Sequence, residues 1–414
     1  MVATMSQSSL TSRVIQRTFT QSWSPYAGAI VILLLCLGLM QQGLFWGVFG
    51  GLKLWGDHLN SFIGLAPYLG IDSELPDPFL HRISLMNIVL FLGALSAALI
   101  SRQFRVNRPP PLEYAWGAGG GILMGLGATL AGGCTVGGFF TPAMFSSPAG
   151  WTMWAGLLLG VVIGLKLLYW TFEHVTWGMQ APVSGPRSPM LRYFPLIGLL
   201  VMAAVTAWSV TWYLSTDKLE SNRAFLLLAV FLIGFAMHRS RFCFSRSLRE
   251  PFMTAEGDMS KAVMLLLFLG IPAGSLLLQQ GSVDPYLAIP STFWLGSLLG
   301  GIVFGIGMIF AGGCASGSLW RAAEGNLKLV VVLLFFAWSG SLFCAIFEQL
   351  GFTVPSYDID FLDGIPEITD LGFQAYFPDI FDGWAVAYLV PLILIIIWYL
   401  LVNYNEKKKH YTVV

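Results

Sequence analysis

The chain has 414 residues, of which 56% are hydrophobic and only 11% are charged, and its mean hydropathy is +0.72. A soluble domain carries about 25% charged residues, so this composition excludes an ordinary soluble protein and predicts a membrane protein. The formal net charge is zero, and we therefore expect no nucleic-acid partner.

Apolar runs follow one another along the whole chain, and each is long enough, or nearly long enough, to cross a lipid bilayer. Several fall short of the roughly 20 residues of a full span, which is typical of transporters with broken helices. The sequence predicts an all-α polytopic membrane protein with nine to ten spans. The ten runs are Tyr26–Val48, Ile83–Ile100, Tyr114–Leu130, Trp151–Trp170, Pro195–Tyr213, Arg223–Met237, Val263–Leu278, Phe293–Phe310, Leu327–Phe347 and Trp384–Leu401.

Basic residues lie in alternate connections between these runs. The connections Gly51–Arg82, Gly132–Gly150 and Glu348–Asp382 carry little or no Lys or Arg. Under the positive-inside rule, ten spans then place both termini in the cytoplasm, with residues 1–25 as a retained cytoplasmic segment. The basic residues are Arg102, Arg105 and Arg108, then Arg187 and Arg192, then Arg239, Arg241, Arg246 and Arg249, then Arg321, and finally Lys407–Lys409.

One motif occurs twice, 180 positions apart. The stretch Gly120–Cys134 and the stretch Gly300–Cys314 share their glycines, one alanine and the final cysteine in register, which indicates an internal duplication. The copies lie on the third and eighth runs, and this odd separation predicts an inverted repeat. We expect repeats at 26–194 and 223–347, a connecting span at 195–222, an acidic external loop at 348–383, and a last span with a basic tail at 384–414.

The Gly-Gly-Cys end of each copy is the candidate functional site. Irregular backbone inside a bilayer persists only within protein or along a watered path. After each break the chain can restart as a short helix, at Thr135–Phe145 and Ala315–Glu324, whose first amides form an anion site. A buried thiol stays neutral and acts as a weak S–H donor. The candidate residues are Gly132, Gly133, Cys134, Thr135, Gly312, Gly313, Cys314, Ala315, Ser316 and Arg321.

A third thiol, Cys243, has arginines on both sides, and we expect it to lie at the cytoplasmic end of the sixth run. Its counterpart on the first run is Gly47, so the first half lacks this thiol. Cys36 and Cys344 have no partner in the repeat and are expected to pack as small apolar side chains. The five cysteines contain no CxxC, and the five histidines are scattered, so we expect no metal, no cofactor and no catalytic residue.

The two Gly-Gly-Cys segments, with Arg321, Glu324-Gly325-Asn326 and Arg241-Phe242-Cys243, resemble the YeeE/YedE family of bacterial inner-membrane proteins, the sulphur-transport domain family. The resemblance implies thiosulfate uptake through an hourglass of inverted repeats, with the anion passed between S–H groups. This role would fall on Cys134 and Cys314, and on Cys243. Some relatives are linked to selenium, so another sulphur or selenium compound stays open as the substrate.

Two other functions stay open. A membrane thiol oxidoreductase would need two thiols within bonding reach. A membrane anchor for a cytoplasmic sulphur-carrier protein would dock it on the basic face around Arg239–Arg249. No intramembrane Asp or Glu stands out as a proton carrier, which favours a facilitated path over proton coupling.

Overall fold

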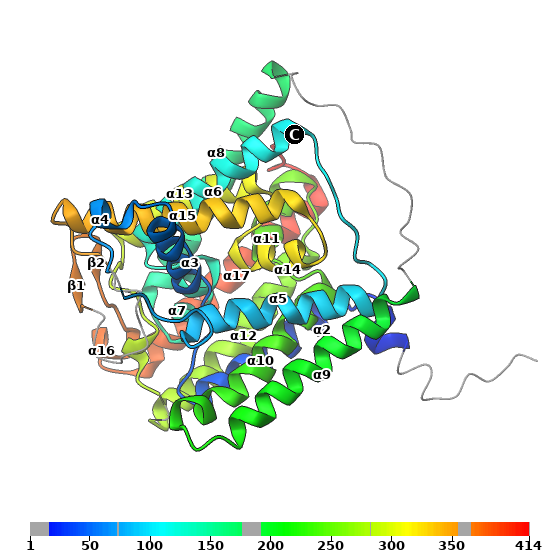
Figure 1. The fold of residues 1–414 in the computed structure, drawn as a ribbon. Helices are drawn as coiled ribbons and strands as arrows, with labels where there is room; N and C mark the ends of the chain where they lie inside the picture. The colour runs from blue at the N-terminus through cyan, green and yellow to red at the C-terminus, as the bar shows by residue number, and fades with distance from the viewer. Residues whose placement is uncertain (1–15, 73, 176–191, 282, 355–365, 414) are drawn as a thin grey trace, which may run out of the picture.

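A computed structural model describes residues 16–72, 74–175, 192–281, 283–354 and 366–413 (Figure 1). These residues form helices and one two-stranded hairpin. In chain order, the first ten elements are η1 (Gln16–Thr20, a π-helix), α2 (Pro25–Gln41), α3 (Phe49–Phe62), α4 (Ala66–Leu69), α5 (Arg82–Ile100), α6 (Pro111–Ala131), η2 (Thr135–Phe140, a π-helix), α7 (Thr141–Met144), α8 (Pro148–His174) and α9 (Phe194–Tyr213). They continue with α10 (Lys218–Ser240), α11 (Phe244–Met253), α12 (Asp258–Gln279), η4 (Pro285–Leu287, a 3-10 helix), α13 (Leu295–Ala311), α14 (Ala315–Ala323), α15 (Leu327–Gln349), β1 (Ile368–Thr369), β2 (Gly372–Phe373), α16 (Phe377–Ile380) and α17 (Trp384–Lys408).

The all-α polytopic fold is confirmed. Within the described part of the chain, nine helical segments are long and apolar enough to cross a membrane, and α2 adds a shorter apolar helix of 17 residues. Each of the ten predicted runs corresponds to one of these helices. The prediction for Arg187 and for most of residues 1–25 concerns positions outside the described residues, as does part of the acidic loop, 355–365.

The sequence predicted one apolar run from Tyr26 to Val48. In the structure, this run is not one continuous helix. Helix α2 ends at Gln41, Gly43 adopts a positive φ of 71°, and a new helix, α3, begins at Phe49. The segment Gly51–Arg82, predicted as an external connection, therefore contains a largely buried helix. Hydropathy missed α3 because it carries Lys53, Asp57 and Asn60. Inside the protein, Lys53 pairs with Asp57, and the Asn60 amide nitrogen donates to Ser341.

The basic connections lie together at one end of the bundle. The amide of Arg105 donates to the Glu324 carbonyl at 3.0 Å, the Arg241 guanidinium donates to Gln103, and the amide of Val413 donates to the Phe252 carbonyl.

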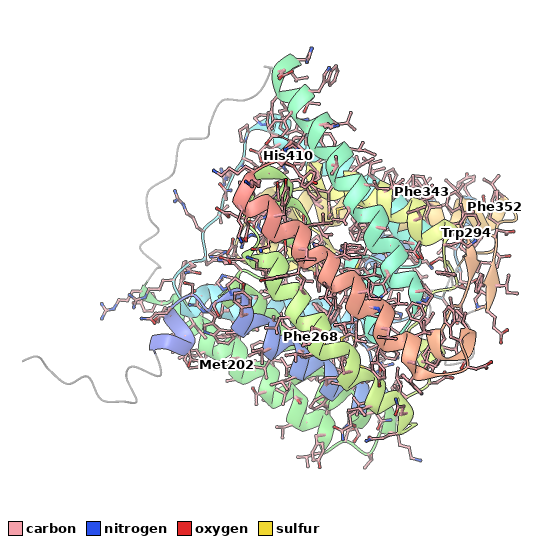
Figure 2. The ribbon with its side chains drawn as sticks, turned by 180° about the vertical axis from the view of Figure 1, so that it is seen from behind. Met202, Phe268, Trp294, Phe343, Phe352 and His410 are labelled. Atoms are coloured by element: carbon pink, nitrogen blue, oxygen red, sulfur yellow. The ribbon has the colours of Figure 1, made fainter. Side chains whose placement is uncertain are left out.

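Base-poor connections meet at the other end of the bundle. There the Gln349 side chain donates to the Tyr68 carbonyl, and the Phe377 amide donates to the Ser146 carbonyl. Figure 1 shows α4, α16 and the hairpin at this end, and Figure 2 places Trp294 and Phe352 there, opposite His410. The grouping of charges follows the prediction, and which end faces the cytoplasm stays a prediction.

Glycines let α6 and α13 pack closely against each other. The contacts that α6 makes with α13 are repeated by the equivalent residues of α13 with α6, as a twofold axis requires. A Cβ on Gly120 would lie 2.5 Å from the Ala311 amide, and one on Gly300 would lie 2.5 Å from the Ala131 amide. Gly127 meets Phe304 in the same way. Since residue numbers rise along one helix as they fall along the other, the helices are antiparallel, as an inverted repeat requires.

The neighbouring contacts repeat the pattern. Gly125 packs on Ser339 of α15, and Gly305 packs on Gly160 of α8. Gly93 of α5 lies against the Phe231 carbonyl of α10, and Gly234 of α10 lies against the Leu90 carbonyl of α5. Small residues allow such close backbone contact inside a bilayer. The domain boundaries themselves stay a prediction.

Candidate functional site

Both Gly-Gly-Cys breaks have nearly the same backbone. Gly132 and Gly312 end α6 and α13 with positive φ values of 65° and 82°, which favour glycine. Cys134 and Cys314 follow in extended conformation, with φ of −82° and −80°. The carbonyl of each cysteine accepts a hydrogen bond of 2.7 Å, from the amide of Gly138 and of Ser318 respectively. The repeated motif is therefore a repeated structure.

Each cysteine caps the helix that follows it. The Cys134 sulfur accepts from the Val136 amide, and the Cys314 sulfur accepts from the Gly317 amide, both at 3.4 Å. The first restart is a π-helix from Thr135 that continues into α7, and the second is α14 from Ala315. The expectation of free amides at these starts needs correction, because the sulfur occupies one of them. The S–H hydrogen of each thiol remains available as a donor.

Within the described residues, three buried cysteines stand directly before a helix start. Cys243 precedes α11 as Cys134 and Cys314 precede η2 and α14, and Val48 holds this place before α3. The sequence had assigned the missing thiol to the neighbouring position, Gly47. The Sγ atoms of Cys243 and Cys314 lie 3.9 Å apart, so the structure pairs Cys314 with Cys243.

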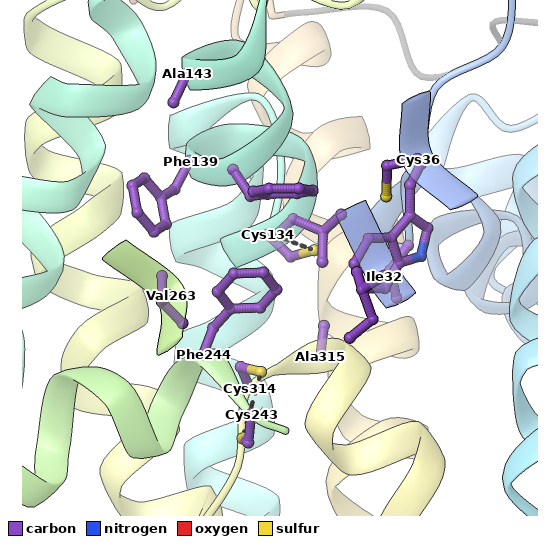
Figure 3. Packing of buried hydrophobic residues seen from close by; sticks show 14 of the residues in the cluster. Ile32, Cys36, Cys134, Phe139, Ala143, Cys243, Phe244, Val263, Cys314 and Ala315 are labelled. Carbon is purple, nitrogen blue, oxygen red and sulfur yellow. Dashed lines mark hydrogen bonds between the residues drawn. The ribbon is translucent and has the colours of Figure 1, made fainter. Parts of the chain in front are cut away.

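Aromatic rings fill the space where these helix starts meet. The Phe244 ring packs on Phe140 at 5.5 Å between centroids, and on Phe139 and Trp46 at 6.3 Å. All four side chains are buried. In Figure 3, Phe244 lies between Cys134 and the Cys243–Cys314 pair. A substrate moving between these thiols would have to displace this ring.

Hydroxyl groups without partners surround Cys314. Thr135, Ser245 and Ser318 are buried, and their hydroxyl oxygens have no hydrogen-bond partner. The Thr135 side chain and the Ser245 backbone both interact with the Cys314 sulfur, and the Ser316 hydroxyl lies 3.7 Å from it. Native proteins leave few buried polar groups unpaired, so these hydroxyls indicate a place for water or a polar ligand. The Thr135 contact also joins the first break to the second.

Arg321 lies beside the second break, as the sequence predicted. Its Nη1 atom donates to the Gly312 carbonyl at 2.8 Å and so holds the break open. Gly313 lies against Ser318, with 3.2 Å from its hypothetical Cβ to the hydroxyl. In the first half, Gly133 adopts φ of 156°, and a Cβ there would meet the Gly138 amide at 2.7 Å. Only glycine therefore fits at Gly133.

The arginines near Cys243 make internal contacts. Arg241 pairs with Glu324, and Arg246 pairs with Glu250 at 2.6 Å. Burial raises the pKa of the Glu324 carboxyl, but the hydrogen bond from His238 and the positive charge of Arg241 lower it by more, so its pKa lies below the usual value. Glu324 therefore stays ionised in this pair.

Sequence reasoning missed Asp57, which is 2% exposed in α3. Asp57 pairs with Lys53 at 2.9 Å, accepts a hydrogen bond from Ser341 at 2.6 Å, and lines a cavity of about 140 Å³ at the base-poor end. Cys344 lines the same cavity. The i, i+4 spacing of Lys53 and Asp57 was the available signal, since such a pair on a short helix can be buried.

Comparison with known proteins identifies the class. The chain matches the family described as Sulphur transport over residues 2–163 and 239–413, which is most of its length, and it belongs to that family.

Individual relatives agree with this assignment. The chain is 26% identical over 320 residues to the Escherichia coli (strain K12) protein named "Probable transporter YedE", covering 74% of this chain and 77% of the relative. It is 36% identical over 109 residues to "Thiosulfate transporter TsuA" of the same organism, covering 25% of this chain and 28% of the relative. The TsuA of Spirochaeta thermophila is 34% identical over 117 residues, or 28% and 32% of the two chains. The protein is thus a multi-pass membrane protein of a family that transports sulphur compounds.

Proposed function

We propose that this protein takes up thiosulfate across a bacterial inner membrane, with both termini in the cytoplasm. One observation carries the proposal: the helix starts that follow Cys134, Cys243 and Cys314 meet inside the bundle, next to buried hydroxyls without partners. The thiosulfate transporters among its relatives match over about a quarter of the chain and support the choice of anion.

The geometry suits a passing anion better than a tightly held one. Neutral thiols and hydroxyls donate weak hydrogen bonds, and a permeating ion needs sites that it can leave. The Thr135 side chain reaches Cys314 from the first break, so the anion passes from the S–H of Cys134 to that of Cys314 with Thr135 between them. Cys243, 3.9 Å from Cys314, receives it next.

Cysteine substitution tests this function. Uptake of radiolabelled thiosulfate into cells that lack other thiosulfate transport should fall to background for Cys134→Ala and for Cys314→Ala. Cys344→Ala is the matched control, because Cys344 is equally buried but lies against Thr129, outside these three helix starts. Membrane amounts are compared by immunoblot. Normal uptake by both Cys134→Ala and Cys314→Ala would rule the path out.

A thiol oxidoreductase is a second candidate, favoured by the short Cys243–Cys314 distance. Forming their disulfide releases two protons and two electrons, which a membrane quinone would have to accept. Thiol counting on protein rapidly quenched during thiosulfate uptake tests this. Loss of two thiols in step with turnover supports the oxidoreductase, and an unchanged count supports passage without redox chemistry.

A sulphur-carrier protein on the basic face stays a proposal. Arg241 and Arg246 already pair with carboxylates of the same chain, so a docked carrier would compete with these contacts. Charge reversal at Arg246 and Arg249 should abolish a carrier pull-down while leaving membrane insertion intact, and an unchanged pull-down would exclude docking at these positions.

A further inference from the structure

Three cations from three helices gather at the second Gly-Gly-Cys break. Arg321 of α14 donates to the Gly312 carbonyl, and the Lys328 ammonium of α15 lies 3.8 Å from where a Gly312 Cβ would stand. The Arg249 guanidinium of α11 interacts electrostatically with Arg321, with Lys328 and with the Cys243 thiol. The positive charge therefore lies next to the Cys243–Cys314 pair.

Carboxylates balance only part of this charge, and Glu250 is the carboxylate that acts on Arg249. Lys328 has Glu113 at 3.5 Å, and the nearby Glu250 is taken by Arg246. Across the described part of the chain, no carboxylate lies within salt-bridge distance of Arg249 or Arg321. The Nε of Arg249 is buried without a hydrogen-bond partner. Like charges at close range repel each other, and buried guanidinium groups normally have an anionic partner.

We propose that Arg249, Arg321 and Lys328 form a binding site for a divalent sulphur oxyanion beside Cys243 and Cys314. Guanidinium groups bind oxyanions with paired N–H donors, so the oxygens would face the cations. The terminal sulfur of thiosulfate would then face the two thiols. All three cationic side chains are partly exposed, which leaves them open to an ion from solution. This site deepens the proposed transport function and rests on it.

The first Gly-Gly-Cys break has no matching cations. Thr141 and Pro148 stand 180 positions before Arg321 and Lys328, and Gly132–Gly150 contains no charged residue. The anion would thus meet neutral donors at the first break and cations at the second. The cationic site would hold the anion on the side of the basic connections before release.

Binding to purified protein tests the site apart from transport. Titration calorimetry with sulfate alone, and with thiosulfate alone, gives a dissociation constant for each. Arg249→Gln and Lys328→Gln should each weaken the binding of both anions about tenfold, as expected for loss of one charge-assisted hydrogen bond. Arg249→Gln should also raise the melting temperature of the anion-free protein, because it relieves repulsion; a purely structural arginine would give the opposite shift.

Lys261→Gln is the matched control, since Lys261 is also basic but pairs with Glu406 away from the breaks. It should leave both dissociation constants unchanged. The site would be overturned if the double variant, Arg249→Gln with Lys328→Gln, bound both anions as tightly as the natural protein. It would also be overturned if Lys261→Gln weakened anion binding as much as Arg249→Gln does. Cys314→Ala separates the two proposals, because its thiosulfate transport tests the path, whereas the dissociation constants of the Arg249 and Lys328 variants test the cationic site. Transport by Cys314→Ala would contradict the path, while the binding data would still judge the cationic site.

Discussion

The two Gly-Gly-Cys breaks share a backbone and differ in their surroundings. Both cysteines are fully buried, have matching φ values, and cap a restarted helix through their sulfur. Cys134 has Val136 and the Phe139 and Phe140 rings around its helix, and no charge lies between Gly132 and Gly150. Cys314 has a second thiol at 3.9 Å, hydroxyls without partners, and cations close by.

This difference separates what the duplication preserves from what it does not. Glycines and the cysteine fix the break, because a positive φ and close backbone contact demand them. The residues around the break are free to differ between the halves. A symmetric frame can therefore carry an asymmetric potential, and an anion would be drawn from the neutral break towards the cationic one.

Among the variants that keep all the cysteines, the largest expected effect comes from adding one methyl group beside the paired thiols. A Cβ on Gly317 would lie 2.7 Å from the Cys243 sulfur and 3.1 Å from the Cys314 sulfur. Overpacking of this kind costs about 1–3 kcal/mol, so Gly317→Ala should displace the thiols and lower thiosulfate uptake by roughly 10- to 100-fold. The measurement is the initial rate of uptake, normalised to the amount of protein in the membrane.

The duplication supplies the control. Gly137 stands at the equivalent position of the first half, and a Cβ there would have no atom within 4 Å. Gly137→Ala should keep uptake within about twofold of normal. Equal loss of uptake in the two variants would mean that the thiol pair is not the sensitive element.

A second prediction concerns the region where the halves are alike. Gly120→Ala and Gly300→Ala place the same atom 2.5 Å from a backbone amide of the facing helix. Both should lower the free energy of unfolding by about 1–3 kcal/mol, and by similar amounts, because the contacts are reciprocal. Thermal unfolding in detergent measures this. Gly119→Ala, with no atom within 4 Å of its Cβ, should be neutral or stabilising; clearly unequal losses at Gly120 and Gly300 would break the symmetry.

The sequence predicted the elements that depend on periodicity and repetition. Long apolar runs predict helices in any membrane protein, and the two copies of Gly-Gly-Cys located both breaks and predicted the opposite directions of α6 and α13. The positions of the cysteines relative to the helix starts followed from the same motif. These features are local or repeated, so one sequence is enough to find them.

Features that depend on distant contacts could not be predicted in this way. Helix α3 is polar enough to resemble a loop until Asn60 and Asp57 are seen to contact Ser341 of α15. The pairing of Cys243 with Cys314 depends on how α11 docks beside α14. The position of Lys328 relative to Gly312 is likewise set by the tertiary fold.

The smallest expected effect probes a side chain that links the two breaks. Thr135 is buried, its hydroxyl makes no hydrogen bond of standard geometry, and its side chain lies close to the Cys314 sulfur. Thr135→Val keeps the shape and removes a polar group that the protein leaves unpaired, so stability should rise by about 1 kcal/mol. Uptake should fall several-fold, because the anion loses a donor between Cys134 and Cys314.

Thr129→Val is the control: the Thr129 hydroxyl donates to the Gly125 carbonyl at 3.0 Å, so stability should not rise and uptake should stay normal. A gain in stability with full uptake in Thr135→Val would show that the two breaks work without a polar link, and the asymmetry between them would then rest on the thiol pair and the cations alone.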